Sequence, residues 1–153
     1  MSVAATAPVR VVVAFDPAHD APSDPTHGYT LGLCEAFAHP ELLLVGLPAE
    51  LTHEFLVHAA EQVATGSRFE HGQVVGGLFP GAPAALRRVG EQHYEAYLQE
   101  ALAHYGTPEF STLQIVFPDR IGRFPWDAGS DLRLRLVQPV LDGKHRKCRW
   151  TCG

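Results

Sequence analysis

The stretch from His27 to Leu47 holds the densest group of chemically reactive side chains in the chain. Two apolar segments, 29–33 and 42–47, have the composition of buried strands. The linker between them carries four side chains with acid–base, nucleophilic or metal-binding chemistry: Cys34, Glu35, His39 and Glu41. Imidazole and carboxylate groups are the usual general acids and bases of enzymes. The candidate catalytic residues are therefore His39, Glu41 and, just upstream, His27.

Cys34 has two interpretations. A nucleophilic thiol needs a base within hydrogen-bond reach, and His27 or His39 could serve. Alternatively, Cys34 is a small buried hydrophobe at a strand end, which is a common place for a cysteine outside a disulfide. We favour the second interpretation.

A metal site is the other chemistry that these side chains could provide, since imidazole and carboxylate ligands suit several divalent ions. Only Glu35 and His39 are four residues apart, and Pro40 disfavours a helix through both of them. Further along, His53 and His58 are five residues apart, so they do not share a helix face as the H-E-x-x-H zinc motif requires. A tight turn at 39–41 and two solvated histidines are the simpler interpretations.

The segment FPDRIGRFPWD at 117–127 is the second unusual stretch, because it combines two aspartates, two arginines and three aromatic rings. Such a segment could form a pocket wall, in which Trp126 stacks on a planar ligand and an arginine meets an anionic group. It could equally be a loop locked by its own ion pairs. The candidate ligand-binding residues are Tyr29, Arg120, Arg123, Trp126 and Asp127.

The composition indicates one domain with a sizeable core, since 46% of the 153 residues are hydrophobic and only 19% are charged. The formal net charge of −5 argues against a nucleic-acid partner, which requires a clustered basic surface. No apolar run approaches the ~20 residues that cross a bilayer, and the first residues lack the pattern of a secretory signal. Three cysteines are too few for a disulfide framework. We expect a cytoplasmic protein that binds neither membrane nor nucleic acid.

The hydrophobic pattern predicts seven strands and two helices. The strands are expected at 9–15, 29–33, 42–47, 73–79, 84–89, 113–117 and, at the edge, 133–141; the helices at 48–65 and 91–105. Three strands before the first helix do not fit a repeated βαβ pattern. The predicted fold is a single α+β domain over 1–141, with a curved, mainly antiparallel sheet or small split barrel and two flanking helices. Residues 142–153 are expected to form a flexible basic tail containing Cys148 and Cys152.

The ordered motifs YTLGL, HPELLLVGLP, QIVFPD, GRFPWD and QPVL resemble the bacterial family catalogued as domain of unknown function 4262. The resemblance covers 9–141, nearly the whole chain. One departure is Phe117-Pro118-Asp119, where the family usually has Trp-Pro-Asp. The resemblance implies no established activity.

Three classes of function are compatible with these patterns, and the sequence leaves open whether the protein is an enzyme. The first is a small-ligand or cofactor-binding protein, with a flavin-type oxidoreductase as one form, whose site lies between 27–41 and 119–127. In it, Trp126 would stack on the ligand, Arg123 would bind its anionic part and His39 would transfer protons. The alternative is a non-catalytic binding or regulatory module, for example in a peptide-maturation system, whose C-terminal tail meets a protein or peptide partner. A metal hydrolase ranks last.

Overall fold

Six strands form one open, mixed sheet in the computed structural model, which describes residues 9–14 and 27–143. The strands are β1 (Arg10–Ala14), β2 (His27–Leu31), β3 (Glu41–Val45), β4 (Val74–Phe79), β5 (Ala82–Arg88) and β6 (Thr112–Val116). The helices are α1 (Leu33–Phe37), α2 (Ala49–Ala64), α3 (Tyr94–Tyr97), α4 (Gln99–Tyr105) and α5 (Leu132–Val137), with the 3-10 helix η2 (Glu91–His93) before α3. The predicted α+β single domain is confirmed.

The sheet has the order β1-β2-β3-β6-β5-β4, and only the central pair, β3 with β6, runs parallel. The mainly antiparallel sheet is therefore confirmed. The sheet does not close into a barrel, because β1 and β4 are its two edges in the described part of the chain. The two central strands, β3 and β6, are buried at every residue.

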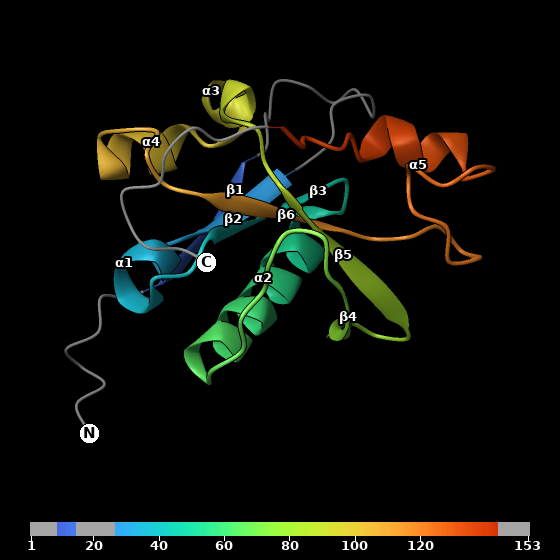
Figure 1. Ribbon diagram of the computed structural model, residues 1–153, viewed down its shortest axis with the longest axis horizontal. Coiled ribbons are helices and arrows are strands. Elements are labelled where there is room, and N and C mark those ends of the chain that lie inside the picture. Colours follow the sequence, from blue (N-terminus) through green and yellow to red (C-terminus); the bar gives the residue numbers. More distant parts are fainter. Residues whose placement is uncertain (1–8, 15–26, 144–153) are drawn as a thin grey trace.

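Both faces of the sheet are covered, as the nearly continuous apolar run of β3 predicts. Leu42 and Leu44 face α2, whose side chains Leu56, Ala59 and Val63 complete that half of the core. Leu43 and Val45 point to the opposite face, under Tyr94, Leu98, Ala101 and Tyr105. In Figure 1, α2 accordingly lies on one side of the strands, while α3, α4 and α5 lie on the other.

Several predicted elements are confirmed to within two residues at their ends, which is the usual uncertainty of element boundaries. The expected helix at 48–65 is α2, and Gly66 follows it with a positive φ of 113°. The expected strands at 73–79, 84–89 and 113–117 are β4, β5 and β6. None of the helices in the described ranges has the length and apolar composition needed to span a bilayer.

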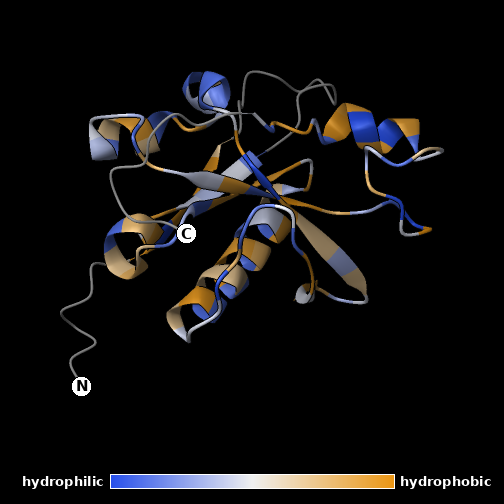
Figure 2. Ribbon diagram, viewed as in Figure 1, coloured by the Kyte–Doolittle hydropathy of each residue, from blue (hydrophilic) through white to orange (hydrophobic). Residues whose placement is uncertain are grey.

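The expected edge strand at 133–141 was wrong, because residues 132–137 form helix α5. The alternating sequence LRLRL has the period of a strand, but Asp131 caps a helix: its side chain accepts a hydrogen bond from the Arg133 N–H at 2.9 Å. Two apolar side chains of this helix face outward, since Leu132 and Leu136 are 61% and 68% exposed. Figure 2 shows the alternation of hydrophobic and hydrophilic residues along α5.

Two further expectations need correction. The helix at 91–105 is broken into η2, α3 and α4, because Leu98 leaves the helical region (φ −126°, ψ 40°) while its side chain is fully buried. The strand expected at 29–33 ends at Leu31, and α1 follows it within the linker. Tertiary packing overrides local propensity at both places. The predicted tail begins at Asp142, which pairs with Val89 in a β-bridge; 144–153, with both of its cysteines, lie outside the described residues.

Candidate functional site

Glu41 is the centre of a buried hydrogen-bond cluster at the start of α1. Its side chain is fully buried and accepts five hydrogen bonds. The donors are the Thr30 hydroxyl at 2.8 Å, the N–H groups of Gly32, Leu33 and Cys34 at 3.0, 3.2 and 3.4 Å, and the Tyr105 hydroxyl. The first N–H groups of a helix have no partner within it, so Glu41 caps α1 from a neighbouring strand.

The electrostatics of this cluster follow from its burial. Loss of solvent raises the pKa of the Glu41 carboxyl, and hydrogen bonds from Tyr105, Gly32 and Thr30 oppose this rise. Burial, together with the neighbouring Glu41, also raises the pKa of Tyr105, so its hydroxyl stays a donor. The cluster holds β2, β3, α1 and α4 together.

His39 is also fully buried and bonds only to backbone in the part of the chain that the structure describes. Its Nε2 accepts a hydrogen bond from the Phe69 N–H at 2.9 Å, so the proton of the neutral ring lies on Nδ1 and is donated to the Pro40 carbonyl at 2.8 Å. Burial lowers the pKa of His39, which favours this neutral form. Both ring nitrogens are therefore hydrogen-bonded, and His39 links the residue before β3 to the segment that follows α2.

His27 and Tyr29 fasten β2 to the helices above it. The His27 Nε2 lies 3.0 Å from the Tyr97 carbonyl, and its ring meets the Tyr97 ring edge-on. The Tyr29 hydroxyl accepts a hydrogen bond from the Glu100 N–H at 3.0 Å. Burial lowers the pKa of His27 and raises that of Tyr29, so both side chains are neutral near pH 7.

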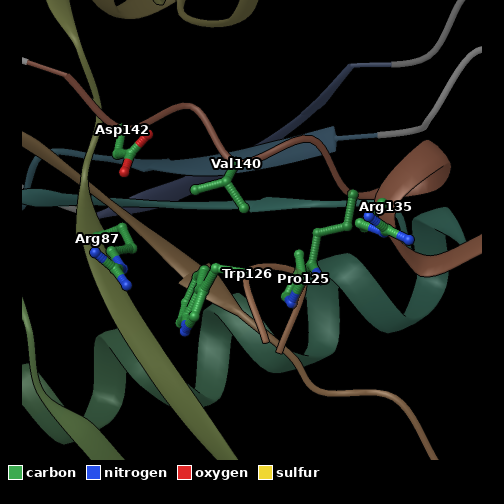
Figure 3. Close-up of a pocket in the computed structure, with 7 residues that line it drawn as sticks. Arg87, Pro125, Trp126, Arg135, Val140 and Asp142 are labelled. Carbon is green, nitrogen blue, oxygen red and sulfur yellow. The ribbon is translucent and has the colours of Figure 1, made fainter. Parts of the chain in front are cut away.

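A cavity of about 430 Å³ lies beside α5 and is the best candidate for a ligand site. Its walls come from β5, the 117–131 loop and the C-terminal segment, and the lining residues are Arg87, Pro125, Trp126, Arg135, Gln138, Val140 and Asp142. Figure 3 shows Arg87 and Asp142 at one end, Arg135 at the other and Trp126 and Val140 between them. Its volume is in the usual range for small-molecule pockets, ~300–1,000 Å³.

Trp126 is the aromatic wall of this cavity and is 40% exposed. The Arg87 guanidinium carbon lies 4.0 Å from the centre of the indole ring, a cation–π contact. Phe124 stacks on the same indole with a centroid distance of 5.2 Å and an interplanar angle of 13°. A ligand that stacks on Trp126 must therefore share it with Phe124 and Arg87, or displace the arginine.

The loop that carries Trp126 is fixed by its own acids. Asp119 accepts hydrogen bonds from the N–H groups of Arg123, Ile121 and Asp131, at 2.9, 3.0 and 3.1 Å. These bonds, that from Arg123 first, lower the pKa of Asp119. Asp127 accepts from the Phe124 N–H at 2.9 Å, and the Arg123 guanidinium donates to the Gly129 carbonyl at 3.0 Å. Trp126 thus projects from an ordered turn.

Two buried glutamines tie the C-terminal segment to β6 and to Phe117, the residue that follows it. The Gln138 amide donates to the Phe117 carbonyl and accepts from the Phe117 N–H, both at 2.9 Å. Gln114 on β6 donates to the Pro139 carbonyl at 2.9 Å and accepts from the Leu141 N–H at 2.8 Å. The two amides together bond backbone groups of Phe117, Pro139 and Leu141. These bonds hold the 138–141 segment in place, so that Val140 lines the cavity.

Of the eight side chains that sequence predicts for the site, only Trp126 lines this cavity. Arg120 is exposed, and Arg123 and Asp127 stabilise the loop. The catalytic candidates lie around α1 and at the start of β2, where His39 and Glu41 are fully buried. Those roles therefore remain predictions, and the structure does not bring the two predicted segments to one cavity.

Sequence reasoning missed the charged residues of the cavity, Arg87, Arg135 and Asp142. The signal for Arg87 was an arginine at the end of an otherwise apolar strand, AALRRV. Arg135 was assigned to a strand, so its direction could not be predicted. Asp142 was assigned to the tail, whereas its β-bridge with Val89 fixes it beside β5.

The other chemistries considered for the chain find less support in the geometry. The Cys34 side chain is buried, and its thiol lies 3.8 Å from the Ser111 carbonyl, as expected for a packed core residue. Across 9–14 and 27–143, no three His, Cys, Asp or Glu side chains converge in the manner of a metal centre.

Comparison with known proteins matched residues 9–131 to the model of a family described as a domain of unknown function, DUF4262. No curated protein and no solved structure matched the chain. The matched region, 9–131, covers β1 through the Trp126 loop and ends at the cap of α5. With most of its length matched, the chain belongs to the DUF4262 family.

Proposed function

We propose that this protein binds a small anionic molecule with a flat apolar part, in the cavity between β5, the Trp126 loop and the C-terminal segment. The observation that carries the proposal is that two arginines at the cavity have no ion-pair partner among the described residues. Arg87 and Arg135 both border the cavity, and neither forms a salt bridge with any described residue. Guanidinium groups that form no salt bridge and border apolar walls are a typical arrangement for recognition of carboxylate or phosphate groups.

The walls support the apolar half of this ligand. Pro125, Trp126 and Val140 provide hydrophobic surface, and the amide of Gln138 is already occupied by Phe117. Polar recognition is therefore left to the arginines and Asp142. A flavin is one candidate, because it has both a flat ring system and, as a nucleotide, a phosphate. We also propose a bacterial, cytoplasmic setting, consistent with the low cysteine content.

Binding can be measured through Trp126 itself. In a Trp150→Phe variant Trp126 is the remaining tryptophan, so its emission reports on the cavity. We expect benzoate to change this emission with a millimolar dissociation constant, and benzyl alcohol, the same ring without the charge, to bind at least about tenfold more weakly. A visible absorption spectrum of the purified protein tests for a retained flavin.

The matched control compares the same substitution at an arginine that lines the cavity and at an arginine outside it. Arg135→Gln in the same background is expected to abolish the benzoate response, whereas Arg68→Gln is not, because Arg68 lies outside the cavity and donates to the Phe37 and Ala38 carbonyls. Equal responses to benzoate and benzyl alcohol in all of these proteins would rule out the proposed anion site.

A protein partner is the second function that we propose, because α5 carries exposed apolar side chains. Leu132 and Leu136, one helical turn apart, are flanked by Arg133 and Arg135. The partner that fits this surface is an acidic segment with apolar residues. The alternative contact through the tail involves 144–153, which are outside the described residues.

Photo-crosslinking tests the partner proposal. A photoreactive residue is introduced at position 136 and crosslinked in the cells that express the protein. We expect a discrete protein adduct, whose yield falls at least about fivefold when Arg133 is changed to Glu. The same residue at position 74 is the control, since Val74 is 59% exposed but lies on β4, away from α5. Identical adducts from positions 74 and 136 would contradict a partner surface on α5.

A further inference from the structure

The two ends of the cavity differ in charge, and this difference bears on the class of ligand. At one end Arg87 lies near Asp142. The backbone of Asp142 pairs with that of Val89, which is two residues after Arg87. At the other end Arg135 projects from α5 without an acidic side chain among the lining residues beside it. Trp126 and Val140 lie between the ends and provide the apolar middle.

The charged groups at both ends are available to a ligand. Arg87 and Asp142 form no salt bridge with each other, so the carboxylate can accept a hydrogen bond while the guanidinium donates one. A ligand edge that offers one acceptor and one N–H or O–H donor satisfies both groups. A second acidic group at this end would instead lie beside the Asp142 carboxylate, and repulsion between like charges disfavours it.

We propose that the ligand is a planar heterocycle with a single acidic group on a side chain. The heterocycle edge, carrying an acceptor and a donor, meets Arg87 and Asp142; the ring lies between Trp126 and Val140; and the carboxylate or phosphate meets Arg135. This inference rests on the proposed function and adds the polarity of the ligand to it. Simple dicarboxylates and plain aromatic acids meet one part of this pattern but not the whole.

Riboflavin and its 5′-phosphate are the probes, because they share one donor–acceptor heterocycle and differ by the phosphate. Binding is followed by flavin fluorescence anisotropy with the full-length protein. The phosphate form is expected to bind at least about tenfold more tightly, as charge-assisted hydrogen bonds to an arginine are among the stronger polar contacts. In Arg135→Gln this preference should fall to about twofold or less, with riboflavin affinity unchanged.

Two further variants test which end of the cavity binds which part of the ligand. Arg133→Gln is the matched control for Arg135, since Arg133 lies on the same helix but does not line the cavity, and it should keep the tenfold preference. Asp142→Ala removes the acceptor of the ring edge and should weaken both flavins by a similar factor, about fivefold or more.

The outcomes separate the two proposals. Equal affinity for both flavins, or a phosphate preference that survives Arg135→Gln, rejects the proposal that the acidic group of the ligand meets Arg135. Binding of a ligand in the cavity would still stand. If neither flavin binds but benzoate still alters Trp126 emission, the heterocycle class is rejected and the anion site stands. If neither the flavins nor benzoate bind, both proposals are rejected.

Discussion

Replacement of Glu41 by alanine is expected to lower the free energy of unfolding by at least about 3 kcal/mol. The variant leaves five hydrogen-bond donors without their acceptor in a fully buried place. Each buried donor that loses its partner costs ~1–3 kcal/mol, and relaxation of the cluster recovers part of the sum over five donors. Urea unfolding measures the change through a lower midpoint at an unchanged slope.

Three companion variants show that the effect belongs to the cluster. Glu41→Gln keeps one acceptor oxygen but turns an NH₂ group toward the donors, so it should recover only part of the loss. Tyr105→Phe removes one donor and should cost about 1 kcal/mol. Glu54→Gln, at an exposed position on α2, should stay within about 0.5 kcal/mol of the wild type. A loss for Glu41→Ala no larger than that for Tyr105→Phe would show that the donors find other partners.

The central elements of the fold could be predicted because their signals are local. The stripe of α2 that includes Leu56, Ala59 and Val63 repeats at helical spacing, and the apolar run of β3 requires cover on both faces. Helix α5 could not be predicted in the same way. Its alternating leucines and arginines match a strand, and its helical form depends on the cap at Asp131, whose own N–H is bonded to the distant Asp119.

The candidate site was less predictable than the fold because its residues meet through long-range pairing. Trp126 could be identified from the unusual composition of its segment. Arg87 reaches that ring only because β5 pairs with β6, which leads into the loop, and no local pattern contains this information. At the Glu41 cluster, reactive residue types at close spacing predicted catalysis, and that role stays a prediction. Sequence could not predict that the Glu41 carboxylate is bonded to backbone N–H and hydroxyl groups inside the core.

Acidification is expected to destabilise the protein through His39, and the sign follows from its buried neutral ring. Burial lowers the pKa of His39 in the folded state, while the unfolded chain keeps the ordinary value of ~6.5. Between these two values the unfolded chain binds more protons, so stability is complete above pH ~6.5 and falls as the pH is lowered through this window. His27 and His71 add to the slope, because burial lowers their pKa values as well.

Replacement of His39 by glutamine separates its contribution from those of the other histidines. Glutamine can still offer an acceptor to the Phe69 N–H but cannot take up a proton, so the variant should lose ~1–2 kcal/mol at pH 7.5 and show a shallower decline toward pH 5. The slope should decrease by up to ~1.4 kcal/mol per pH unit, the value for one proton. His53→Gln, an exposed position on α2, is the control and should retain the wild-type slope. Urea midpoints from pH 5 to 8 could show the same pH dependence of stability for His39→Gln and the wild type. His39 would then be protonated to the same extent in the folded and the unfolded chain. The donor–acceptor assignment at Pro40 and Phe69 would then be wrong.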